Sequence, residues 1–205
     1  MKKMLSFALV TIALASFATG ATAQQLFDFN GQTLLPGAVG GHLTMYSVVY
    51  DPAPGTTPIP LDFASYEFTL VVTDLELVNV NGNAQEYAGG TVTIYQDDAT
   101  SADYTNIGTF TDGTAVLIGT VDLNRIQLTA TLTTIGGLVD WTGGTRLDDI
   151  ALADQVDWPF LSGASNSATV TEPGYDENWD GKVEPEHEII DNETVSWGGL
   201  RVMYR

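Results

Sequence analysis

Apolar and polar residues alternate along most of the chain beyond residue 24, and few apolar residues recur at helical spacing. An alternation of period two places one set of side chains on the buried face of a β-strand and the other set toward water. The apolar runs are rich in Val, Ile, Thr, Tyr and Phe, which favour strands. The pattern predicts strands at residues 42–50, 66–73, 75–80, 87–95, 106–110, 114–121, 126–134 and 195–204.

Turn signals separate these runs. Asn81-Gly82-Asn83, Asp112-Gly113 and Gly143-Gly144 supply the positive φ that tight turns require. The proline-rich residues 51–60 and the polar residues 162–167 are predicted connections. Many short strands with regular turns predict an all-β domain. We expect an antiparallel two-sheet β-sandwich of jelly-roll or Ig-like type, and the alternative is a closed β-barrel.

The first 23 residues have the pattern of a secretory signal peptide. Lys2 and Lys3 precede an apolar run at 5–17, and Ala21-Thr22-Ala23 provides a small-x-small cleavage site. Cleavage there leaves residues 24–205 as a single domain. The style of the signal is bacterial, so we expect a secreted, periplasmic or cell-surface protein. We do not expect membrane insertion, because strands such as 75–80 are short for an outer-membrane barrel.

The chain is strongly acidic. Seven basic residues face 26 acidic ones, which gives a formal net charge of −19, and loss of Lys2 and Lys3 with the signal peptide makes the remainder more negative. A field of this sign repels polyanions, so nucleic acid and anionic membranes are improbable partners. The sequence contains no cysteine, so an exported fold is held together without disulfides.

Oxygen-bearing side chains occupy alternate positions in the segment that begins at Asp176. Asp176, Asn178 and Asp180 stand at relative positions 1, 3 and 5, and Gly181 follows at position 6. Such spacing lets a short loop wrap a hard cation, with the glycine permitting the sharp turn. The alternative interpretation is an acidic surface turn, because Asp, Asn and Gly favour turns by themselves.

This segment resembles the calcium loops of EF-hand and dockerin proteins, over residues 176–188 only. The resemblance implies Ca²⁺ as the bound ion. The residues that would hold it are Asp176, Asn178, Asp180, the carbonyl of Lys182, Glu184, and Glu186 or Glu188 in place of the family's twelfth-position carboxylate, where this chain has His187.

Catalytic patterns are weak in comparison. The chain has only two histidines, His42 and His187, and it has neither a cysteine nor a Gly-x-Ser-x-Gly elbow. No pair among the acidic residues is distinguished by its spacing as the pair that glycoside cleavage needs. We therefore expect a protein that is not an enzyme, and we keep a polysaccharide-acting enzyme as an alternative.

The sequence favours a secreted, non-catalytic binding or surface-structural module stabilised by calcium. A glycan or a cell-surface protein is the expected partner, because exposed aromatic side chains of β-sandwiches commonly stack on sugar rings. Trp179 is the candidate ligand platform, since it lies inside the proposed calcium loop. The alternative role is that of a subunit in an extracellular layer or fibre.

Overall fold

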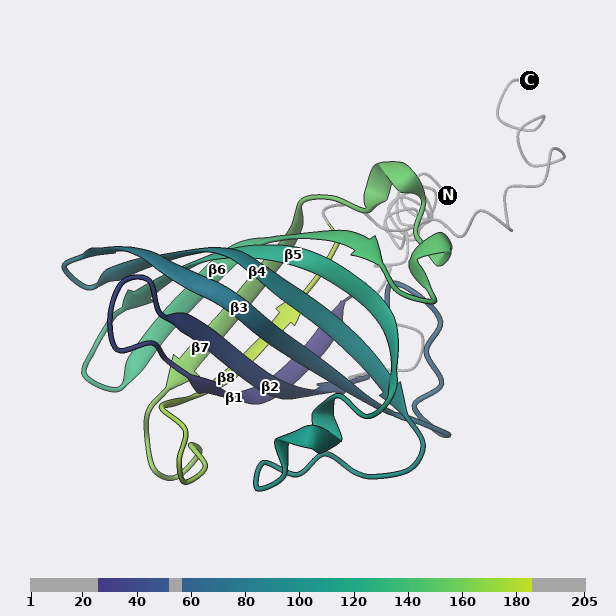
Figure 1. The fold of residues 1–205 in the computed structure, drawn as a ribbon, viewed down its shortest axis with the longest axis horizontal. Coiled ribbons are helices and arrows are strands. Elements are labelled where there is room, and N and C mark those ends of the chain that lie inside the picture. The colour runs from purple at the N-terminus through teal and green to yellow at the C-terminus, as the bar shows by residue number, and fades with distance from the viewer. Residues whose placement is uncertain (1–25, 52–56, 186–205) are drawn as a thin grey trace, which may run out of the picture.

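The computed structural model describes residues 26–51 and 57–185, which form one closed antiparallel β-barrel (Figure 1). The predicted signal peptide and the predicted strand at 195–204 lie outside the described residues. The strands are β1 (Phe27–Leu34), β2 (His42–Tyr50), β3 (Glu67–Asn81), β4 (Ala84–Asp97), β5 (Thr114–Gln127), β6 (Leu132–Gly143), β7 (Trp158–Ser165) and β8 (Glu177–Val183).

Pairing of the first strand with the last closes the barrel. Each strand pairs with the next one in sequence, and β1 also pairs with β8, with Phe27 opposite Val183 and Thr33 opposite Glu177. The all-β prediction is confirmed. The predicted two-sheet sandwich is wrong and the alternative, a closed barrel, is correct. Local alternation cannot distinguish the two, because both present one face of every strand to a core and only the non-local β1–β8 pairing decides.

The strand predictions hold best where the alternation is regular. β2 has the predicted bounds, and the predicted strands at 66–73 and 75–80 are one long strand, β3, which continues through an irregularity at Asp74, whose φ is 57°. Two predictions are wrong. Residues 106–110 contain the 3₁₀ turn η1 (Ile107–Phe110), and residues 126–134 cross the turn between β5 and β6.

Four strands were not predicted: β1, β7 and β8 entirely, and β6 for most of its length. In these segments small or polar residues occupy inward positions, among them Gly31 on β1, Ser162 on β7 and Glu177 on β8, and they interrupt the apolar alternation. Residues 162–167 were expected as a connection, but residues 162–165 form the second half of β7. They form a strand because β6 and β8 pair with them on both sides, which a single-sequence pattern does not reveal.

The barrel interior is filled by side chains. Large apolar residues point inward from every strand and are almost fully buried, among them Phe27, Phe29, Phe68, Phe160, Trp141, Trp158 and Trp179. Phe27 stacks on Trp158 with ring centroids 6.1 Å apart. Gly31 also faces inward, and a Cβ placed there would lie 2.3 Å from Ser47 Cβ. The lumen is therefore a packed core.

The connection between β4 and β5 folds back over the outside of the barrel. Thr69 Oγ1 on β3 donates a hydrogen bond of 2.7 Å to the carbonyl of Phe110, and Tyr104 OH donates one of 3.3 Å to the carbonyl of Asn30 on β1. Tyr175, from the connection between β7 and β8, donates to the Tyr104 carbonyl at 3.0 Å. Two loops thus brace the outer face of β1 to β3.

The remaining helical elements are short. The connection between β6 and β7 contains the 3₁₀ turns η2 (Leu147–Asp149) and η3 (Leu152–Asp154), seen at the upper right of Figure 1. In the described part of the chain, no helix has the length and apolar character needed to cross a membrane.

Candidate functional site

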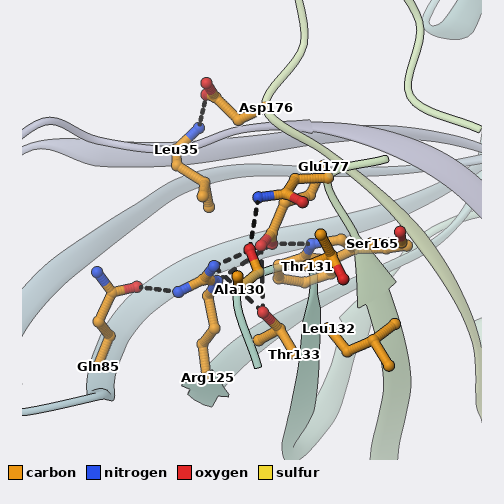
Figure 2. A network of polar contacts seen from close by, with 12 residues as sticks. Leu35, Gln85, Arg125, Ala130, Thr131, Leu132, Thr133, Ser165, Asp176 and Glu177 are labelled. Atoms are coloured by element: carbon orange, nitrogen blue, oxygen red, sulfur yellow. Dashed lines mark hydrogen bonds and ion pairs between the residues drawn. The ribbon is translucent and has the colours of Figure 1, made fainter. Parts of the chain in front are cut away.

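The most concentrated buried polar chemistry lies inside one end of the barrel (Figure 2). The carboxylate of Glu177 on β8 receives hydrogen bonds from Arg125 on β5, which approaches both of its oxygens, from Thr133 Oγ1 at 3.2 Å and from the Trp179 indole N–H at 3.0 Å. The Arg125 guanidinium also donates to Gln85 Oε1 at 3.0 Å. Every charge in this group is paired, so it links strands and leaves no vacant position for a ligand.

The segment with the calcium pattern is an extended strand over Glu177–Val183 and does not form the predicted wrapped loop. Asp176, Asn178, Asp180 and Lys182 are successive members of one alternating set. A strand separates such side chains along its length and does not make them converge on one point. The strand forms because β1 and β7 pair with it on both sides, which outweighs the turn preference of Asp, Asn and Gly.

Several of the proposed calcium ligands have other partners. Asp176 Oδ2 accepts the backbone N–H of Leu35 at 2.8 Å, and Asn178 Nδ2 donates to the Gly31 carbonyl at 3.0 Å. Lys182 Nζ lies 2.7 Å from Glu184 Oε2. Within residues 26–51 and 57–185, no three His, Asp or Glu side chains are grouped so that they could hold a metal ion. Glu186 and Glu188 lie outside the described residues, and calcium binding stays a prediction.

Trp179, the proposed ligand platform, faces the barrel interior and is 0 % exposed. Its ring meets Phe160 edge-on, with centroids 6.4 Å apart. Trp141 and Trp158 are buried in the same core. These three indoles cannot stack on a sugar ring in solvent, because residue parity along β6, β7 and β8 directs each of them inward.

The outer wall of the barrel carries two adjoining shallow, open depressions across β6, β7 and β8. The two depressions, of about 430 and 560 Å³, share Thr134, Gly163 and Asp180 as lining residues. These three residues are cross-strand neighbours, because Gly163 pairs with Thr134 on one side and with Asp180 on the other. We call this continuous feature the outer groove. Its floor is low at Gly163, where a Cβ would meet nothing within 4 Å.

One end of the outer groove is apolar. Leu128 and Leu132, at the turn between β5 and β6, are 63 % and 52 % exposed, and Val170 beside them is 47 % exposed. Three exposed aliphatic side chains therefore lie together at the rim of this depression.

The other end of the outer groove is charged. Asp28 on β1, together with Asp180 and Lys182 on β8, lines it, and Asp28 stands opposite Lys182 in the strand pairing. Partial burial, and then the negative charge of Asp180, raises the pKa of Asp28. The positive charge of Lys182 lowers the pKa of Asp28. The ammonium group of Lys182 is also paired with Glu184. Carboxylates therefore dominate this end.

Sequence reasoning named part of this surface for a different purpose. It assigned Asp180 and Lys182 to a calcium loop, and it missed Asp28, Gly163 and the exposed leucines. No signal in the sequence marks Leu128 and Leu132 as exposed, because both fall on the apolar face of the strand predicted at 126–134. Asp28 joins Asp180 in this surface only because β1 pairs with β8. That pairing links residues far apart in the sequence, so local patterns do not predict it.

The fold defines the class: an eight-stranded antiparallel barrel with a packed lumen and an open depression on its outer wall. Comparison of the chain with protein-family models, with curated proteins and with solved structures gives no match.

Proposed function

We propose that this protein is an exported, non-catalytic binding module that holds its ligand in the outer groove. The observation that carries the proposal is the contrast between the two surfaces of the barrel wall. The inner surface is packed with aromatic and aliphatic side chains, whereas the outer surface has a groove lined by exposed leucines and carboxylates. A ligand therefore finds complementary chemistry outside the barrel.

The distribution of polarity supports a barrel that stands in water. Spanning barrels carry an apolar band outside and polar side chains inside. Here the order is largely reversed. Glu76, Glu86 and Asp122 are exposed at outward positions of three successive strands, whereas most lumen side chains are apolar, apart from the polar group around Arg125 and Glu177. Export through a cleaved signal peptide and a surface of this kind agree with a secreted, periplasmic or cell-surface location.

A role as a subunit of a layer or fibre receives less support. Assembly by strand addition uses an unpaired sheet edge. In the described strands the barrel is closed and every strand has two neighbours, so such an edge is not offered there.

Glycoside cleavage is a second candidate, favoured by one observation. Asp28 and Asp180 line the same depression, and the charge of Asp180 contributes to the raised pKa of Asp28, as in a pair that divides the roles of acid and base. Release of reducing ends from polysaccharides, lost in both Asp28→Asn and Asp180→Asn, would establish this activity and refute the non-catalytic proposal.

Filling the outer groove tests the main proposal. Gly163 has ordinary strand geometry and open space above it, so Gly163→Trp places a ring in the groove without entering the core. Thr120→Trp, at an exposed position of β5 outside the groove, is the matched control. With ligands selected from glycan and peptide arrays, Gly163→Trp should abolish binding and Thr120→Trp should retain it. Equal binding by both folded variants would refute the outer groove as the site.

A further inference from the structure

We infer that the outer groove binds an extended polypeptide segment that carries an aliphatic side chain and, close to it, a lysine or arginine. This inference rests on the proposed binding function and adds the class of ligand. It follows from the order of chemistry along the groove, which runs from exposed aliphatic side chains, over a glycine floor, to a pair of carboxylates.

The apolar end fits an aliphatic side chain. Leu128, Leu132 and Val170 surround a depression of about 560 Å³, and Ala164 in its lining is only 5 % exposed, so the depression reaches the barrel wall. Burial of a leucine or valine from a partner against these three side chains would remove apolar surface from water on both molecules.

The acidic end fits a basic group. Asp28 and Asp180 face the depression, and the positive charge of Lys182 is compensated by Glu184 at 2.7 Å. A cation placed between Asp28 and Asp180 relieves their mutual repulsion. The chain's formal net charge of −19 adds a long-range attraction for basic partners and repels a second copy of the chain.

The open floor between the two ends fits a polypeptide backbone. Gly163 leaves space above the middle of the groove, and its cross-strand neighbour Thr134 also lines the groove. In an extended segment, side chains two residues apart project to the same side. One aliphatic and one basic residue at such a spacing can therefore point toward the barrel together.

The groove chemistry favours a peptide over a glycan. Neither depression has an aromatic residue in its lining, so a pyranose ring has no stacking surface there. A peptide needs none, since its contacts would be aliphatic packing and ion pairing.

The test uses synthetic peptides of about ten residues, long enough to cross the barrel wall at the rise of an extended strand. One peptide repeats Ser-Leu-Ser-Arg. A second replaces Arg with Glu, and a third replaces Leu with Ser. We expect the Leu/Arg peptide to bind at least about tenfold more tightly than either of the others, and its affinity to fall as salt is raised.

Variants of the protein test how much the acidic end and the apolar end of the outer groove each contribute to peptide binding. Asp28→Asn with Asp180→Asn should weaken the Leu/Arg peptide about three- to tenfold, as expected for partly exposed ion pairs. Glu76→Gln with Glu86→Gln makes the same change in net charge at exposed positions outside the groove and should leave the affinity within about twofold. Leu132→Ser should weaken the Leu/Arg peptide and leave the Ser/Arg peptide unaffected.

The possible failures are distinguishable. Equal affinities for the Arg and Glu peptides, or equal effects of the two double substitutions, would overturn the peptide inference. Selective binding on a glycan array that Gly163→Trp abolishes would also overturn it, while leaving the outer groove as the site. Binding of the Leu/Arg peptide that Gly163→Trp does not affect would overturn both.

Discussion

Arg125 and Glu177 form an ion pair inside the barrel although 52 residues separate them in the chain. Arg125 lies on β5 and Glu177 on β8, so the pair joins strands that do not neighbour one another in the sheet. Thr133 and Trp179 complete the hydrogen bonds of the carboxylate. Because this carboxylate is satisfied, its burial does not carry the cost of an unpaired buried charge.

Removal of one partner of this pair should be strongly destabilising. We expect Glu177→Gln to lower the free energy of unfolding by about 3 kcal/mol, because Arg125 loses its counter-charge while staying buried. The double variant Arg125→Met with Glu177→Leu should recover most of this loss. Urea denaturation measures both.

The control for the ion pair is Arg146→Gln. Arg146 pairs with Asp149 on the surface, where the loss should stay below about 1 kcal/mol. A loss for Glu177→Gln as small as that of Arg146→Gln would contradict the described geometry.

Two strand glycines on opposite faces of the barrel wall should respond differently to substitution by alanine. A Cβ at Gly31 would lie 2.3 Å from Ser47 Cβ and 2.5 Å from the Tyr46 carbonyl oxygen, so Gly31→Ala should cost about 1 to 3 kcal/mol through overpacking. Gly163 has free space, and Gly163→Ala should be neutral or stabilise by up to about 1 kcal/mol. Thermal unfolding compares them, and equal midpoints would show that Gly31 does not face the packed lumen.

The raised pKa of Asp28 should make the stability of the protein depend on pH. Its pKa is raised in the folded protein by burial and by Asp180, so the folded state retains a proton at pH values where the unfolded chain, with an ordinary value of 3.8, has lost it. This group therefore reduces stability as the pH rises above 3.8. Asp28→Asn should be more stable than the unsubstituted protein at neutral pH, and the difference should vanish below the ordinary value.

Asp103 provides the opposite case. Hydrogen bonds from the N–H and hydroxyl of Thr105 lower the pKa of Asp103, so its contribution to stability is present above 3.8 and is lost as the pH falls through the lowered value. Asp103→Ala should be less stable than the unsubstituted protein at neutral pH and equal to it in strong acid. The same sign for both variants at neutral pH would refute these assignments.

The effect of calcium on stability distinguishes the paired strand seen at Glu177–Val183 from the calcium loop predicted to begin at Asp176. Because Asp176 Oδ2 accepts the Leu35 N–H, Asp176→Ala should lower the free energy of unfolding by about 1 kcal/mol, equally with excess calcium and with chelator. Asp180→Ala should have little effect, since Asp180 is exposed. A midpoint that rises with calcium, and loses this rise in Asp180→Ala, would instead establish the ion that the calcium-loop resemblance implies.

The sequence by itself determined the all-β class and the strands of strongest alternation. His42–Tyr50 is an example, because the apolar residues Leu43, Met45 and Val49 lie two or four positions apart and share the buried face of the strand. The Asn81-Gly82-Asn83 turn was equally readable, since Gly82 adopts a φ of 61° that glycine accepts without strain. The acidic charge is likewise a property of composition, and it disfavours polyanionic partners whatever the fold.

Only the tertiary structure decided whether segments such as the one around Asp180 form a loop or a strand. It also decided which residues from distant parts of the sequence become neighbours. Asp180 belongs to a sequence that suits a wrapped loop, yet pairing of β8 with β1 and β7 extends it and places Asp180 beside Gly163 and near Asp28. The physical reason is that backbone pairing between strands distant in sequence satisfies hydrogen bonds on both sides of a segment at once. Local preferences of single residues are weaker than this combined effect, so barrel closure and the outer groove emerge only in the folded chain.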